Sequence, residues 1–162
     1  MRIGAAPSAT RVSSIRVARA DAIASAVLTL QTSGEGFFDI TRDVSRFVEE
    51  AKAVDGVLLL FLRHTSASLV IQENADPDVQ TDLLTALRRV APDNAGWVHD
   101  TEGPDDMPAH IKAMLNGVCL HVPVNNGRLG LGTWQGVYVA EHRHAPHRRD
   151  VVLQFLGSCR QD

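Results

Sequence analysis

The feature that most constrains the fold is an uninterrupted apolar segment near the middle of the chain. Residues 56–62 read GVLLLFL and are followed directly by the polar residues Arg63 and His64. The segment is far shorter than the ~20 apolar residues that cross a membrane, and a short run of this kind is typical of a strand covered on both faces. We therefore expect a globular domain built around a sheet, with no membrane partner.

Three stretches show helical spacing, and the other apolar segments show strand patterns. Apolar residues recur at helical spacing over residues 41–54, with Thr41 as the expected N-cap. Asp76 and Pro77 are the expected cap and first residue of a second helix, and a short third helix covers residues 109–115. The other expected strands are residues 26–32, 68–73, 118–124, 134–141 and 150–156. This order predicts an α+β fold, one compact domain with a mainly antiparallel sheet or sandwich and about three helices.

Charge divides the chain into two unequal parts. The first 20 residues contain four arginines, no acid and no apolar periodicity. The rest of the chain holds the other 12 of the 16 basic side chains and all 19 acidic ones, a balance that disfavours binding to duplex nucleic acid. We expect residues 1–20 to be a disordered Arg/Ser/Ala-rich extension, with a transit peptide as the alternative, and residues 21–162 to be the single domain.

The two cysteines, Cys119 and Cys159, lie too far apart to form a CxxC motif. Cys119 belongs to the apolar segment GVCLHV, where a buried, unreactive thiol is expected. Two cysteines without a pattern suit a reducing compartment, so we expect a cytoplasmic protein.

The most unusual polar stretch is HDTEGPDDMPAH, residues 99–110. It holds two histidines, His99 and His110, and four carboxylates around a Gly-Pro turn. Neutral imidazole is a common ligand of zinc and related divalent ions, so a turn that brings both rings together predicts a metal site. Asp105 or Asp106 is the expected cap of the helix that follows, and in the alternative reading this cap is the only role of the segment.

A second candidate site lies where the central strand ends. His64 follows the apolar run and precedes the hydroxyl-bearing residues Thr65, Ser66 and Ser68. The rim of a buried strand is a frequent place for a ligand site, and hydroxyl groups donate well to phosphate or carboxylate oxygens. In the alternative, the imidazole and the hydroxyls serve only the local turn.

The remaining histidines fit structural roles better. His121 alternates with apolar neighbours and is expected on a strand face, while the three histidines of residues 142–149 (HRHAPHRR) are expected in a solvated hairpin turn. In the segment GTWQG, Trp134 and Gln135 stand between glycines that permit close approach of the backbone. Trp134 either stacks on a planar ring or fills the core.

Three segments together resemble the YjbQ family, whose members are described as secondary thiamine-phosphate synthases. They are HTSASLVIQENADPDV, HDTEGPDDMPAHIKA and GRLGLGTWQGVYVAEHR, and the likeness runs in order from about residue 27 to residue 157. The resemblance implies a compact α+β fold that forms a homotrimer, with a metal-binding pocket near the subunit contacts. It also implies that His64, His99 and His110 are the metal ligands, with Glu141 as a further candidate.

The activity implied by this resemblance joins a hydroxymethylpyrimidine diphosphate to a thiazole phosphate and releases pyrophosphate. Zinc is the expected ion, and magnesium is an alternative because the substrate carries a diphosphate. Donors and positive charge must stabilise the leaving pyrophosphate. The expected substrate-binding residues are Arg63, Thr65, Ser66, Arg128, Trp134 and Gln135. The expected catalytic residues are Glu102, Asp106 and Lys112.

Two other functions fit the same residues. A histidine site with a bound water suits a metal-dependent hydrolase of a phosphate or other ester. A trimer that binds a metal or a small ligand without catalysis is the third possibility. In each case the expected partners are further copies of this chain and a small phosphorylated or anionic molecule.

Overall fold

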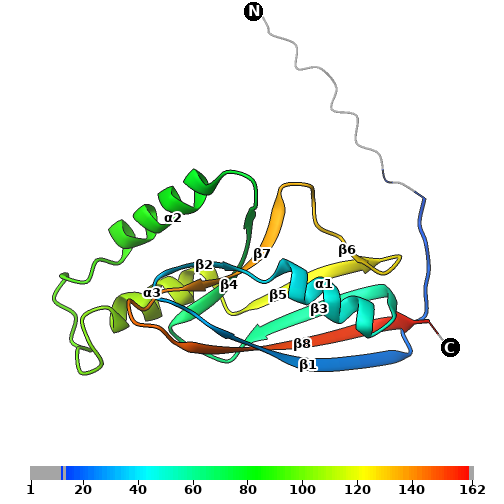
Figure 1. Ribbon diagram of the computed structural model, residues 1–162, viewed down its shortest axis with the longest axis horizontal. Coiled ribbons are helices and arrows are strands. Elements are labelled where there is room, and N and C mark those ends of the chain that lie inside the picture. Colours follow the sequence, from blue (N-terminus) through cyan, green and yellow to red (C-terminus); the bar gives the residue numbers. More distant parts are fainter. Residues whose placement is uncertain (1–11, 13, 161–162) are drawn as a thin grey trace, which may run out of the picture.

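The structure, a computed structural model, describes residue 12 and residues 14–160 (Figure 1). Within that part, the chain forms two sheets and three helices. In chain order the elements are β1 (Ala22–Gln31), β2 (Gly36–Asp39), α1 (Thr41–Glu50), β3 (Ala53–Leu62), β4 (Ala67–Glu73), α2 (Pro77–Val90), α3 (Asp106–Asn116), β5 (Cys119–Asn125), β6 (Arg128–Leu129), β7 (Gln135–Glu141) and β8 (Arg148–Cys159).

The apolar strand β3 lies in the middle of the larger sheet. This five-stranded sheet has the order β1-β8-β3-β5-β6, and a second, three-stranded sheet has the order β2-β7-β4. All strand pairs are antiparallel, and Leu60 of β3, for example, stands opposite Leu120 of β5 and Leu153 of β8. The predicted α+β fold with antiparallel sheets and three helices is confirmed. The short strand β6 escaped the sequence patterns because two residues show no periodicity.

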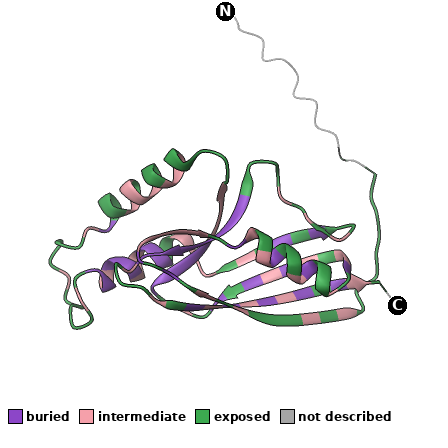
Figure 2. Ribbon diagram, in the orientation of Figure 1, coloured by how far each residue is buried: buried purple, intermediate pink, exposed green. Residues whose placement is uncertain are grey.

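The core is formed by apolar side chains from both sheets and from α1. Leu58, Leu60 and Leu62 are fully buried on one face of β3, where they belong to the same cluster as Val44 and Val48 of α1 (Figure 2). Inward-facing residues of β4, β5, β7 and β8 also belong to this cluster. Removing these side chains from water is the main favourable term in folding, at roughly 25 cal/mol per Å² of apolar surface.

The opposite face of β3 is only partly covered. Phe61 is 42% exposed, and Val57 and Leu59 are half-buried. The prediction that both faces of this strand are buried is therefore wrong for the single chain. Successive side chains of a strand point to opposite sides of the sheet, so every second apolar residue of β3 is turned away from the core.

Helix α2 lies at the periphery of the domain, where it contacts β2 and α3, and none of its residues is buried (Figures 1 and 2). Its start is as predicted, because the Asp76 carboxylate accepts a hydrogen bond from the Asp78 backbone N–H at 2.9 Å and Pro77 is the first helical residue. The apolar side chains of α2 make the helix amphipathic without placing it in the core.

Helix α1 begins differently from the prediction. Thr41 is the first helical residue rather than the N-cap, and its backbone N–H donates to the Asp39 carboxylate at 2.8 Å. Since Asp39 supplies the capping acceptor, the Thr41 hydroxyl instead accepts from the Val137 backbone N–H and ties α1 to β7. The helix also ends earlier than expected, because Lys52 adopts a φ of 51° and the chain enters β3 at Ala53.

Most of the predicted N-terminal extension lies outside the described residues. Residues 14–20 are exposed and have no regular secondary structure, and Arg16 donates to the side chains of Asp55 and Asn126. Disorder of residues 1–20 and the boundary at residue 21 stay predictions. Among the described residues, no helix combines the length and the hydropathy needed to cross a membrane.

The cysteines differ from the prediction in one respect. Both are free thiols, but Cys119 is exposed at the start of β5 rather than buried. The alternation of β5 explains the error, since Val122 and Val124 occupy its inward-facing positions and Cys119 points the other way.

Candidate metal centre

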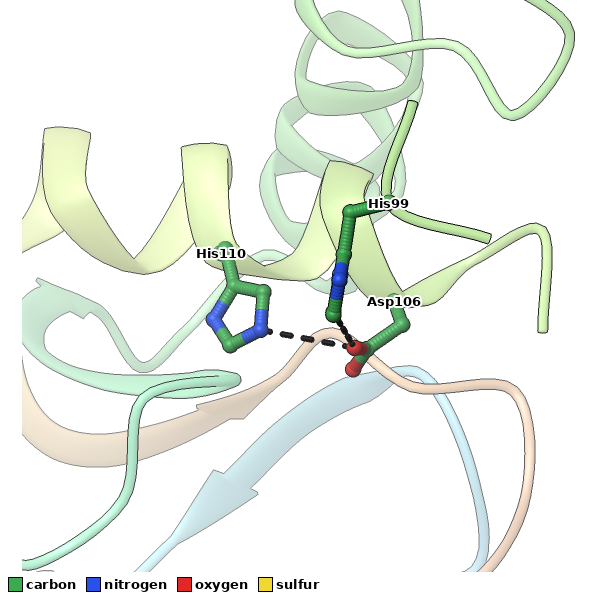
Figure 3. A group of neighbouring side chains, drawn as sticks. All are labelled: His99, Asp106 and His110. Atoms are coloured by element: carbon green, nitrogen blue, oxygen red, sulfur yellow. Dashed lines mark hydrogen bonds and ion pairs between the residues drawn. The ribbon is translucent and has the colours of Figure 1, made fainter. Parts of the chain in front are cut away.

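The start of α3 and the loop before it bring three potential metal ligands together (Figure 3). One ring nitrogen each of His99 and His110 and one carboxylate oxygen of Asp106 all lie within 4.8 Å of one another. Asp106 Oδ2 is 2.8 Å from His99 Nε2 and 3.4 Å from His110 Nε2. Asp106 and His110 are four residues apart on α3 and therefore face the same side of the helix. Two imidazoles and one carboxylate form a donor set that fits zinc.

A hydrogen bond fixes the tautomer of His110. Its Nδ1 lies 2.9 Å from the backbone carbonyl oxygen of Thr65, which only accepts hydrogen bonds. Nδ1 therefore carries the proton, and the lone pair of Nε2 is directed toward Asp106. A metal-binding histidine in proteins commonly donates its second N–H to a carbonyl or carboxylate in this way.

The Arg143 guanidinium holds the acidic end of the site in place. It donates to Asp106 Oδ1, to Asp105 Oδ2 at 3.0 Å and to the backbone carbonyl of Glu102 at 2.7 Å. Asp106 is only 2% exposed, so this neighbouring positive charge offsets the cost of burying its carboxylate. Because Arg143 occupies Oδ1, Oδ2 remains directed at the two imidazoles.

The expected capping role of Asp105 or Asp106 is wrong. Asp105 stands at the N-cap of α3, but neither carboxylate accepts a capping hydrogen bond from the first turn. The Asp105 side chain instead binds Arg143 and the His144 backbone N–H. Burial alone would raise the pKa of Asp105, but these two hydrogen bonds outweigh it and hold the pKa below its usual value.

His64 does not belong to the cluster of possible ligands. Its Nε2 accepts a hydrogen bond from the Asp150 backbone N–H at 3.0 Å, so that lone pair is already used. Burial, followed by the charge of Arg149, lowers the pKa of His64, which favours the neutral ring. The structure thus brings together two of the three predicted histidine ligands, and the third position is filled by Asp106, which we expected to act in catalysis.

A cavity of about 540 Å³ opens beside the centre, and His110 lines it. The predicted substrate-binding residues Arg63 and Thr65 line it as well, next to His64. The rest of the lining consists of Phe61, Leu62, Ala113, Met114, Gly117 and Val118. The HTSA segment and the MPAH segment, far apart in sequence, therefore meet at one cavity.

The other predicted site residues lie elsewhere. Lys112 is buried and binds the Glu35 carboxylate at 2.8 Å, so it is neither a solvated helix lysine nor a group facing the cavity. Ser66 is buried, and its hydroxyl accepts from Arg149. Glu102 is largely exposed, with its carboxylate 4.0 Å from Arg143.

The other expected substrate-binding residues, Arg128, Trp134 and Gln135, are also separate from the centre. Arg128 lines a pocket beside α1, and Trp134 lines another beside the start of α2. Gln135 accepts a hydrogen bond from the Gly132 backbone N–H and so stabilises its own turn. Trp134 is largely exposed, which rules out the expected role in the core.

The predicted solvated hairpin of residues 142–149 is only partly solvated. His144 is exposed, but His142 is completely buried and its Nε2 lies 2.8 Å from the Ser68 hydroxyl. Burial, and then the charge of Lys112, lowers the pKa of His142 to about 4. The error arose because β7 continues as buried backbone up to Glu141, so His142 still belongs to the interior.

The candidate ligand Glu141 is fully engaged inside the protein. Its carboxylate binds the Arg149 guanidinium through both oxygens, at 2.6 and 2.7 Å, and also accepts from the Thr32 hydroxyl at 2.9 Å. Burial raises the pKa of Glu141, but these partners outweigh it and lower the pKa below the usual value. A carboxylate with its oxygens occupied in this way fits a structural ion pair and not a metal ligand.

Sequence reasoning missed two features of the centre. Asp106 and His110 have the four-residue spacing that places two ligands on one helix face, and this signal was readable in DMPAH. Arg143 gave no comparable signal, because it reaches Asp106 from a distant segment of the chain.

A compact antiparallel α+β domain with a histidine–carboxylate centre on its short helix defines the class of the protein, and the comparisons define the family. The chain belongs to the YjbQ-like family of UPF0047 proteins, whose model matches residues 26–158. A UPF0047 protein of Synechocystis sp. is 46% identical over 132 residues, which cover 81% of this chain and 90% of that protein. The UPF0047 protein YugU of Bacillus subtilis is 39% identical and covers 78% of this chain and 93% of its own length.

Solved structures agree with this assignment. A crystal structure of a YjbQ/UPF0047 family protein from Clostridium acetobutylicum has a TM-score of 0.75 and 40% identity, and the match covers 80% of this chain and 98% of that one. A YbjQ-like protein of unknown function from Sulfolobus solfataricus has a TM-score of 0.76 and 25% identity, with coverage of 85% and 100%. The family predicted from the three sequence segments is confirmed.

The predicted thiamine-phosphate synthase activity is corrected by these comparisons. The names of these relatives give only the UPF0047 family and state no activity, and one solved neighbour is described as having unknown function. The geometry agrees with this correction, since Lys112, Arg128 and Trp134 do not line the cavity beside His110. The specific transfer reaction is therefore not retained.

Proposed function

We propose that this protein is a zinc-dependent hydrolase of a small anionic ester, with His99, Asp106 and His110 as the metal ligands. The observation that carries the proposal is the convergence of these three side chains, with the Nε2 lone pair of His110 already directed into the group. Zinc is favoured over magnesium because two of the three donors are imidazole nitrogens.

The surrounding residues support hydrolysis in defined ways. Zinc bound by three protein ligands supplies positive charge for an anionic oxygen and lowers the pKa of a coordinated water. Arg143 keeps the Asp106 carboxylate oriented, and the Thr65 carbonyl keeps His110 in the binding tautomer. The partly exposed ring of His99 leaves the centre accessible to solvent and to a substrate from outside.

Metal analysis of single variants tests this proposal. We expect the purified wild-type protein, dialysed against zinc, to retain close to one ion per chain. His99→Ala, Asp106→Asn and His110→Ala should each lower zinc affinity by about 100-fold or more, because each removes a direct ligand. His144→Ala is the matched control, since that exposed ring lies outside the group. Full zinc occupancy in the three ligand variants would contradict the proposed centre.

A hydrolysis assay tests the enzymatic part separately. The zinc-loaded wild-type protein should cleave an activated phosphate or carboxylate ester, and the three ligand variants should lose that activity. A protein that binds zinc stoichiometrically but cleaves neither class of ester would be a binding protein instead of a hydrolase.

We further propose that the chain acts as a homotrimer, as predicted from the family resemblance. Support comes from the outer face of the five-stranded sheet, where Ile23, Leu156 and Val57 stand side by side across three strands. Ile23 is 70% exposed, which is costly for a large apolar side chain unless another chain covers it. Light scattering should give about three times the 17.6 kDa chain mass, and Ile23→Asp should lower it. A wild-type mass near that of one chain would contradict this.

A cytoplasmic location is also part of the proposal. It is supported by two free thiols, one of them exposed, which suit a reducing compartment. Fractionation of cells that produce the protein, with a marker for each compartment, tests the location directly.

A further inference from the structure

Both polar and apolar residues line the cavity beside the metal centre. Arg63, His64, Thr65 and His110 are the polar lining, which we name the polar wall, and His110 also belongs to the proposed metal ligands. Phe61, Met114 and Val118 belong to the apolar lining, which we name the apolar wall. A ligand that fills this space of about 540 Å³ therefore meets the centre with one end and apolar side chains with the other.

His64 lines this cavity and has a hydrogen-bond donor left for a ligand. A neutral imidazole has one N–H and one lone pair, and the lone pair on Nε2 is used by the Asp150 backbone N–H. The proton therefore lies on Nδ1, and within the described part of the chain the ring makes no second hydrogen bond. A fixed N–H beside a metal site fits an anionic oxygen.

Arg63 adds positive charge at the same wall. Its guanidinium is 56% exposed, and its nearest carboxylate, Asp150, is 3.9 Å away. A long, exposed ion pair of this kind is weak, so the guanidinium is able to turn toward a ligand at little cost. Together with a bound divalent ion, Arg63 makes the polar wall complementary to a negatively charged group.

The apolar wall is more extensive than an anion alone requires. Met114 is 76% exposed and Phe61 is 42% exposed, and both line the cavity. Covering such side chains with an apolar ligand group contributes about 0.8 kcal/mol for each buried methylene, which is about fourfold in affinity. The apolar wall therefore favours ligands with an apolar portion, and the polar wall favours ligands with an anionic group.

We propose that the site takes an amphipathic anion: a small phosphate- or carboxylate-bearing molecule whose apolar portion lies against Phe61, Met114 and Val118, and whose anionic oxygen accepts from His64 Nδ1–H. This proposal rests on the metal centre proposed above and adds to it the class of substrate. It also assigns His64 to substrate binding instead of metal ligation.

A series of alkylphosphonates tests the apolar wall. These probes carry a phosphate-like head that is not hydrolysed, so calorimetry on the zinc-loaded full chain measures binding alone. From methyl- to propyl- to pentylphosphonate, affinity should rise by about fourfold per methylene. Met114→Glu should abolish this dependence, whereas Leu115→Glu, an exposed neighbour on α3 that does not line the cavity, should preserve it. Equal affinity for all three probes in the wild-type protein would overturn the proposed ligand class.

Two variants of His64 test the donor. His64→Leu should leave zinc content unchanged and weaken methyl- and pentylphosphonate by the same factor, about tenfold, because only the head group loses a hydrogen bond to a charged acceptor. His64→Gln should recover much of this loss, since an amide both accepts from Asp150 and donates to the ligand. Loss of zinc in His64→Leu would overturn the assignment by making His64 a ligand, and unchanged affinity in this variant would overturn it as well.

Zinc content measured on the same samples separates the two proposals. A wild-type protein that holds no zinc contradicts the proposed function. If the protein binds zinc but its affinity for alkylphosphonates does not depend on the length of the alkyl chain, the proposal of an amphipathic ligand is wrong. The proposed metal centre is not affected by that result.

Discussion

Two carboxylates in this protein, Asp106 and Glu141, are both buried beside an arginine, yet they differ in what remains for a ligand. Glu141 has its oxygens occupied by Arg149, by the Thr32 hydroxyl and by backbone N–H groups. Asp106 gives one oxygen to Arg143 and directs the other at two imidazoles. Full saturation describes a structural ion pair, whereas a carboxylate oxygen that faces two imidazole nitrogens describes a possible metal-binding site.

The surroundings of the two carboxylates also differ, in how far solvent reaches them. Glu141 lies near His142 and the buried Lys112–Glu35 pair, so that interior is polar but closed to solvent. Asp106 lies behind His99 and His110, whose rings are partly exposed. Burial in the first region contributes to stability, and partial exposure in the second permits exchange of a ligand. The comparison predicts that substitutions in the first region change folding and those in the second change binding.

The largest effect is expected at Glu141. Glu141→Ala leaves Arg149 buried without its partner, which should lower the free energy of unfolding by about 3–5 kcal/mol. Urea denaturation measures the change. Glu141→Gln keeps the shape of the side chain, so its free energy of unfolding should lie between those of Glu141→Ala and wild type. Glu102→Ala is the control on an exposed carboxylate and should change stability by less than about 0.5 kcal/mol. If Glu141→Ala were as stable as wild type but lost zinc, Glu141 would act in metal binding and not in folding.

A pH dependence of stability is expected from His142. Its folded-state pKa of about 4 lies below the ordinary value of 6.5, so between these values the unfolded chain binds the extra proton. This contribution to stability is complete above pH 6.5 and is lost as the pH falls toward 4, by roughly 3 kcal/mol in total. His142→Gln should flatten the stability profile in this window, measured by urea denaturation at several pH values. If His142→Gln and wild type had the same slope of unfolding free energy against pH, the pKa of His142 would not be lowered in the folded protein.

Removal of the negative charge at Asp106 should affect binding more than folding. Asp106→Asn keeps the size of the side chain but loses the anionic ligand, so zinc affinity should fall by about 100-fold, or about 2.7 kcal/mol. Competition with a zinc-binding dye measures this, and the urea midpoint of the zinc-free protein should change less than in Glu141→Ala. If Asp106→Asn lost as much stability as Glu141→Ala and kept its zinc affinity, Asp106 would be a structural residue like Glu141 and not a metal ligand.

The smallest effect is expected at Arg143, which acts through Asp106. Arg143→Lys keeps the charge but loses the forked contacts to Asp105 and Asp106, so zinc affinity should fall by about tenfold. Arg148→Lys, on an exposed side chain, is the matched control. A zinc affinity equal to that of wild type would mean that Asp106 is positioned by helix α3 alone.

The sequence allowed the fold to be predicted further than the site. Apolar periodicity reports on burial, and burial determined the sheets and helices, as at Leu58, Leu60 and Leu62. The His99–His110 pairing was also predictable, because a Gly-Pro turn separates two residues of one short segment. The polar partners were not. Ser68 reaches His142 only because β4 pairs with β7, and Arg149 and Glu141, although only eight residues apart, are joined by a turn whose path no local pattern indicates.

His64 shows a second limit of sequence reasoning. A histidine in a suggestive motif has two nitrogens, and their roles depend on which neighbour uses each one. The Asp150 N–H that occupies Nε2 lies 86 residues away, so no local pattern distinguishes a metal ligand from a hydrogen-bond donor at this position. The same holds for Lys112, whose burial depends on Glu35 in a distant loop.

The hydrogen bond between the Asp150 amide and His64 also makes the centre visible to spectroscopy. The amide proton points at an imidazole on the cavity wall, so its chemical shift depends on the charge and orientation of that ring. The ¹⁵N–¹H signal of Asp150 is therefore a reporter inside β8 that senses an occupant of the cavity without touching it. A titration of the ¹⁵N-labelled protein, followed at this one resonance, would report binding with no dye and no substitution.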